Sequence, residues 1–106
     1  MSGVDNRSID ELLAQVRAQF TASLPSKIDA LEQLVAAGAW GDVRRAAHKL
    51  RGSASTYGHV ELGAAAAAME DALLAAADPP DDVARTTIAA LLAQARHAAR
   101  AAAEAR

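Results

Sequence analysis

The sequence lacks cysteine altogether and contains few aromatic residues and few prolines. Without cysteine, the chain can form no disulfide framework, no thiolate metal site and no cysteine nucleophile. Its apolar runs stay well short of the ~20 residues that span a bilayer, so we expect no membrane association. The formal net charge of -2 gives no overall basic character, and we therefore do not expect nucleic acid as a partner.

The chain length and the first residues bear on domain count and location. A chain of 106 residues is enough for one domain and too short for two. We expect a single domain over residues 1–106, with its helices at about 8–103. The first five residues lack the basic-then-apolar order of a signal peptide. We therefore expect a cytoplasmic location. We also expect a monomer, and a free-standing protein is slightly favoured over a piece of a larger one.

Alanine supplies much of the apolar content of the sequence. Alanine is the best helix former because it loses no side-chain entropy when it joins a helix. Small side chains also allow neighbouring helices to approach closely. The composition therefore indicates helices packed on helices, with little sheet.

The first expected helix begins at Ser8, which forms a capping box with Glu11 three residues later. An apolar stripe follows at helical spacing, with the members Ile9, Leu12, Leu13, Val16, Phe20, Leu24, Ile28, Leu31, Leu34 and Val35. Pro25 interrupts this stripe. One long, kinked helix is favoured, and the alternative is a break near Ser23 that places Pro25 in the first turn of a second helix.

Turn residues divide the rest of the chain. Gly38 is expected to end the first helix, and Gly58 the second. The second helix is expected to begin near Trp40-Gly41-Asp42, with a cap at Asp42, and to run to about Tyr57. The third is expected from about Val60 to Ala77, and the last from about Asp81 to near Ala103. Short connections between long amphipathic helices favour antiparallel neighbours. The sequence therefore predicts an all-α fold, an antiparallel up-down four-helix bundle.

The second helix carries a histidine beside its apolar seam. The seam consists of Val43, Ala47, Leu50, Ala54 and Tyr57. His48 follows Ala47 directly, and ~100° of rotation therefore places its imidazole at the edge of the seam, open to solvent. A neutral imidazole nitrogen is a nucleophile that is available at cellular pH.

The neighbours of His48 suit an anionic group. Arg44, Lys49 and Arg51 lie within one turn of it, and cations stabilise a phosphorylated imidazole. The hydroxyl of Ser55 could add a hydrogen bond to such a group. The plainer interpretations are that Ser55 is a small packing residue and that the basic residues form an ordinary solvated face. Gly52 costs its helix ~1 kcal/mol relative to alanine. It either clears space beside the imidazole or permits close helix packing.

These residues resemble a known family. The segment that resembles the histidine phosphotransfer (HPt) motif is His48-Lys49-Leu50-Arg51-Gly52-Ser53-Ala54-Ser55. The similarity extends over about Ile9 to Leu74, and the following helix shares the family's spacing at Gly58, Leu62, Ala66, Met69 and Glu70. One departure is Ala65, where a large aliphatic residue is common. The resemblance implies a four-helix bundle with an exposed phosphoacceptor, His48, that reacts through Nε2.

The resemblance also implies a function and partners. The chain would be a phosphocarrier in a two-component phosphorelay, accepting and donating a phosphoryl group on His48. Its partners would be response-regulator receiver domains and a hybrid or conventional histidine kinase, with Mg²⁺ supplied by the receiver and no cofactor bound by this chain. We expect no autonomous kinase activity and no metal site, because the sequence has neither a nucleotide-binding loop nor a metal-ligand cluster. The alternatives are a docking module that carries no phosphate and a phosphohistidine phosphatase.

Overall fold

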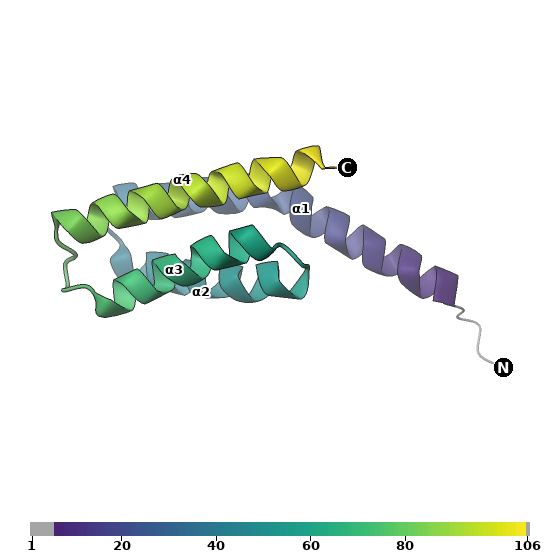
Figure 1. Cartoon of the computed structure of the whole chain (residues 1–106), viewed down its shortest axis with the longest axis horizontal. Coiled ribbons are helices and arrows are strands. Elements are labelled where there is room, and N and C mark those ends of the chain that lie inside the picture. Colours follow the sequence, from purple (N-terminus) through teal and green to yellow (C-terminus); the bar gives the residue numbers. More distant parts are fainter. Residues whose placement is uncertain (1–5, 106) are drawn as a thin grey trace.

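A computed structural model describes residues 6–105, with side chains from Ser8 onward. In this part of the chain the elements are four helices, α1 (Asn6–Ala36), α2 (Trp40–Thr56), α3 (Val60–Ala75) and α4 (Asp82–Glu104). No strand occurs among these residues. The predicted all-α fold is therefore confirmed (Figure 1).

The four helices pack in a ring, in which each touches two others. α1 packs against α2, α2 against α3, α3 against α4, and α4 against α1. The connections between them are short, so consecutive helices run in opposite directions (Figure 1). The antiparallel up-down bundle predicted from the sequence is the observed arrangement. None of the helices in the described part of the chain is long and apolar enough to cross a membrane.

α1 runs without a break through Pro25, as the favoured prediction had it. A proline inside a helix removes one backbone hydrogen bond. Here its ring lies at the surface, while Leu24 and Ile28 beside it are fully buried. Burial of these neighbours favours an unbroken helix at this point. The predicted start at Ser8 is wrong, because the helix already includes Asn6 and Ser8 lies inside its first turn.

The helix ends follow the turn residues closely. Gly38 and Gly58 adopt positive φ values of 68° and 77°, and both complete Schellman motifs. In the second motif, the His59 N–H donates to the Ala54 carbonyl at 2.8 Å. Asp81 caps α4 by accepting from the Ala84 N–H at 2.9 Å. α3 ends at Ala75, two residues before the predicted Ala77.

The predicted cap at Asp42 is wrong. α2 begins at Trp40, the cap position is occupied by Ala39, and Ala39 makes no side-chain cap bond. Asp42 instead lies in the first turn, where it pairs with Arg45. A carboxylate in the first turn still interacts favourably with the positive end of the helix dipole. The acid therefore favours the same helix start from a different position.

The core lies between the four helices and is built largely from aliphatic residues and alanine. It includes the predicted α2 seam, with Val43, Ala47, Leu50 and Ala54 all buried and Tyr57 packed against them. Ala65 is also buried. At one end of the bundle Phe20 stacks on Tyr57, with 4.7 Å between ring centroids, and lies 5.3 Å from the His59 ring.

The first turns of α1 project beyond this aromatic end. We call residues 6–19 the overhang. Figure 1 shows it extending past both the end of α4 and the α2–α3 turn. Ile9, Leu12 and Leu13 are accordingly 45%, 60% and 46% exposed. The predicted apolar stripe therefore continues past the bundle, onto a part of α1 that the other described helices do not cover (Figure 1).

Candidate functional site

His48 lies on the outer edge of α2, where the sequence placed it. Its neighbour Ala47 is completely buried, whereas 70% of the His48 side-chain surface is exposed. The buried seam fixes the rotation of α2, and that rotation determines which way the imidazole points. The ring is therefore attached to a rigid element and remains accessible to a macromolecular partner.

A carboxylate from the next helix holds one nitrogen of this ring. Glu70 Oε2 of α3 lies 2.6 Å from His48 Nδ1. The other oxygen, Oε1, accepts a 3.1 Å hydrogen bond from Arg51 Nη1. Only 9% of the Glu70 side chain is exposed. Glu70 thus joins the two helices at the site, with both carboxylate oxygens engaged.

The charge state of Glu70 determines which imidazole nitrogen is free. Burial raises the pKa of the Glu70 carboxyl, but hydrogen bonds from His48 and Arg51, with electrostatic attraction to both, bring the pKa below its ordinary value. The carboxylate is therefore ionised at neutral pH and can only accept hydrogen bonds. His48 Nδ1 must then carry the proton. In the neutral ring, Nε2 consequently keeps its lone pair.

Close helix packing brings Glu70 to His48. Gly63 of α3 faces Ala54 of α2, and a Cβ added at Gly63 would lie 3.6 Å from the Ala54 Cβ. Ala47 of α2 and Ala66 of α3 are fully buried nearby in the same core. Small side chains along this contact let the two backbones approach closely. Glu70, two turns along α3 from Gly63, therefore reaches the imidazole without leaving the helix.

Gly52 lies one turn beyond His48 and faces open space. A Cβ added there would meet no atom within 4 Å. Close packing inside this protein therefore does not require glycine at this position. Glycine at position 52 lowers helix stability, and clearance of space beside the imidazole is the remaining explanation for it. This clearance stays a prediction.

The predicted basic residues are less closely gathered than their spacing suggested. Arg51 is directed toward acids, bonding Glu70 and lying 3.9 Å from Asp71. Lys49 lines a groove between α1 and α2 together with Lys27. Arg44 is half-buried beside Trp40, and Ser55 lies near Arg51 by the α2–α3 turn. Among the described residues, none of these side chains except Arg51 joins the His48–Glu70 network. Their contact with a phosphoryl group stays a prediction.

The comparison with protein families agrees with this geometry. The family model described as the Hpt domain matches residues 15–101. The chain belongs to the Hpt domain family. Hpt domains act in histidine phosphotransfer within phosphorelays, where they work with receiver domains and histidine kinases. They are phosphocarriers rather than kinases. Comparison with curated proteins and with solved structures finds no match.

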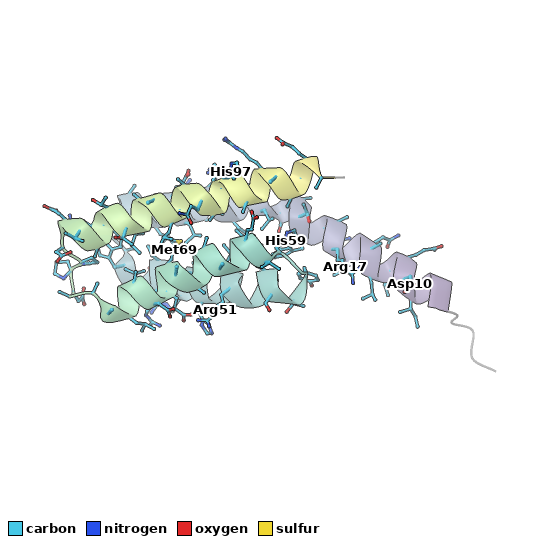
Figure 2. All side chains as sticks on the ribbon, viewed as in Figure 1. Asp10, Arg17, Arg51, His59, Met69 and His97 are labelled. Carbon is cyan, nitrogen blue, oxygen red and sulfur yellow. The ribbon has the colours of Figure 1, made fainter. Side chains whose placement is uncertain are left out.

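The matched segment of this Hpt domain contains the whole His48–Glu70 network. It also contains the other two histidines, which lie in different surroundings. His59 lies tilted against Phe20 at the aromatic end, and His97 lies on α4 beside a groove between α3 and α4 (Figure 2). In the described part of the chain, no three His, Asp or Glu side chains are grouped as metal ligands would be.

Sequence reasoning missed the role of Glu70. The residue was noted only as part of the family resemblance, not as a partner of His48. A signal was nevertheless present, because Glu70 follows Leu62 and Ala66 at helical spacing and therefore occupies the buried face of α3. A buried acid requires a partner. That partner could come from either helix packed against α3, and of these two α2 carries His48 and Arg51.

Proposed function

We propose that this Hpt domain is a phosphocarrier, which takes a phosphoryl group from a receiver aspartate onto Nε2 of His48 and passes it to a second receiver. The observation that carries the proposal is the 2.6 Å contact between Nδ1 and Glu70 on a ring that is otherwise exposed. This contact supports a nucleophile that is held at Nδ1 and accessible at Nε2.

The transfer step follows from this geometry. The Nε2 lone pair attacks phosphorus in line with the aspartyl oxygen, the N–P bond forms, and the P–O bond breaks. The aspartate leaves as a carboxylate, so no proton has to move. The ring, still protonated at Nδ1, becomes positively charged, and the Glu70 carboxylate lies against that charge. Transfer to the second receiver is the reverse reaction.

The partner is expected to supply what this chain does not. We expect Mg²⁺ on the receiver, where it would neutralise the phosphoryl oxygens. The groove between α1 and α2 offers a docking surface, because it is lined by the apolar side chains of Leu31 and Leu50 together with Lys27 and Lys49. These two lysines would favour an acidic partner surface.

Labelling tests the proposal directly. The full chain is incubated with radiolabelled phosphoryl-receiver domains from the source organism, and separately with ATP and Mg²⁺ alone. We expect an acid-labile label on His48, located by mass spectrometry without acid, and no label from ATP alone. Labelling by ATP alone would make the chain a kinase. A His48→Gln variant that still relays the signal would support the docking module instead.

A further inference from the structure

The overhang of α1 carries an apolar surface that the proposed phosphotransfer does not use. Ile9, Leu12 and Leu13 are about half exposed, and no other described helix reaches them. The family match begins only at Gln15, so most of the overhang lies outside it. Large aliphatic side chains gathered on one face of a helix indicate an interaction surface.

The spacing of these residues is that of a helix–helix seam. Ile9, Leu13, Val16 and Phe20 follow one another at steps of four, three and four residues. This alternation is the heptad pattern by which one helix packs along another. Phe20 is already buried in the bundle, so the exposed part of the seam comprises Ile9 and Leu13, with the half-buried Val16 next along it and Leu12 at its edge.

The charges beside the seam indicate how a second copy of the helix would pair with it. Asp10 and Arg17 are seven residues apart, and therefore lie on the same flank of the seam, where Figure 2 labels both. Within the side chains that the structure describes, neither forms an ion pair. When two identical helices pair antiparallel, the same flank of each faces the other. Asp10 of each copy then lies beside Arg17 of the other. In a parallel pair, this flank would instead face the one that carries Leu12 and Gln19.

We propose that the overhang is a self-association surface, on which a second copy of this chain packs antiparallel through Ile9, Leu13 and Val16. The overhang is about 20 Å long, so two copies overlap along it with their bundles at opposite ends. The seam includes no residue of the His48 site, and both phosphoacceptors stay open. Because the two copies overlap over only about 20 Å, we expect a weak contact. The dimer is therefore concentration-dependent, and this proposal replaces the expectation of a monomer.

Sedimentation equilibrium of the full chain, from about 5 to 500 µM, tests self-association. We expect a monomer–dimer equilibrium in the native chain. Leu13→Glu should remain monomeric, whereas Ala14→Glu, the matched control off the seam, should still dimerise. A native chain that is monomeric throughout, or equal losses in the two variants, would overturn the proposal. Far-UV circular dichroism and phosphotransfer on each sample show that overhang and bundle are intact.

Charge exchange tests the orientation. Asp10→Arg and Arg17→Glu should each weaken the dimer about threefold to tenfold, and the double variant should recover the native dissociation constant. Because the chain lacks cysteine, single cysteines give a second test. Asp10→Cys mixed with Arg17→Cys should form disulfide dimers faster than either variant alone. Faster cross-linking of the separate variants, or failure of the double variant to recover, would refute the antiparallel pairing.

Discussion

His48 lies in the middle of α2 and His59 at the turn between α2 and α3, and each has one ring nitrogen near an oxygen of another residue. His48 Nδ1 lies 2.6 Å from the Glu70 carboxylate, and its ring projects into solvent. His59 Nε2 lies 3.4 Å from the Thr21 hydroxyl, and its ring is half-buried beside Phe20. The comparison shows that pairing alone does not make a nucleophile. What distinguishes His48 is an anionic partner on one nitrogen and open space at the other.

Replacement of each histidine is the strongest test of this contrast. His48→Gln should reduce phosphotransfer from a labelled receiver at least about 1,000-fold, because the nucleophile is lost. His59→Gln should leave the rate within about twofold of native, because that ring contributes to packing alone. Both rates are measured by single-turnover transfer. A large loss in the His59 variant with native-like stability would contradict the assignment.

Removal of the Glu70 charge should produce a smaller loss. Glu70→Gln is expected to slow transfer about tenfold to a hundredfold, because a neutral amide does not stabilise the ring charge that forms on attack. The amide N–H₂ can also donate to Nδ1, which moves the ring proton onto Nε2 and blocks the nucleophile. Asp71→Asn is the matched control, since Asp71 is exposed and lies 3.9 Å from Arg51. Equal rates in the two variants would show that the Glu70 charge is not used.

Substitutions of Gly52 test the stability of the fold and the access of a receiver to His48 separately. Gly52→Ala should raise the free energy of unfolding by about 1 kcal/mol, because alanine is the better helix former and the added methyl meets no neighbour. Gly52→Leu should keep the fold but slow receiver transfer about tenfold by occupying the space beside His48. Denaturant unfolding and transfer rates on the same samples check both. A leucine variant with native rates would remove the clearance role.

Lowering the pH should reduce the contribution of ionised Glu70 to the free energy of unfolding. Folding lowers the Glu70 pKa below its ordinary value of 4.5, so the stability that the ionised carboxylate contributes is fully present above that pH. It is lost as the pH falls through the lower, folded-state pKa. Glu70→Gln should therefore show a shallower loss of stability with acid than the native chain. Urea unfolding between about pH 7 and pH 3 measures both slopes, and identical slopes would contradict the shift.

Much of this fold follows from local pattern. The α2 seam and the glycine-terminated helices could be read from the sequence, because periodicity and positive φ are properties of short segments. The start of α1 and the exposure of Leu13 could not. A heptad stripe looks the same whether the neighbouring helix lies along it or ends before it, and where the neighbours end depends on how long α2, α3 and α4 are.

At the site too, features within one helix could be predicted from the sequence, and a contact between helices could not. His48, Gly52 and the basic residues are adjacent on one helix, so sequence spacing brought them to attention. Glu70 lies 22 residues from His48, and its contact depends on the small side chains that let α3 approach α2. The same contact explains Arg51, whose proximity in sequence suggested a phosphoryl ligand but whose guanidinium pairs with Glu70.

The openness of the His48 ring has a consequence for how long the signal is kept. A phosphoryl group attached there would stand in bulk water, with no loop or second domain of the described chain to shelter it. Its lifetime between partners would then depend on the intrinsic resistance of the N–P bond to hydrolysis. Rapid transfer to the next protein, rather than shielding from water, would then keep the phosphoryl group from being lost.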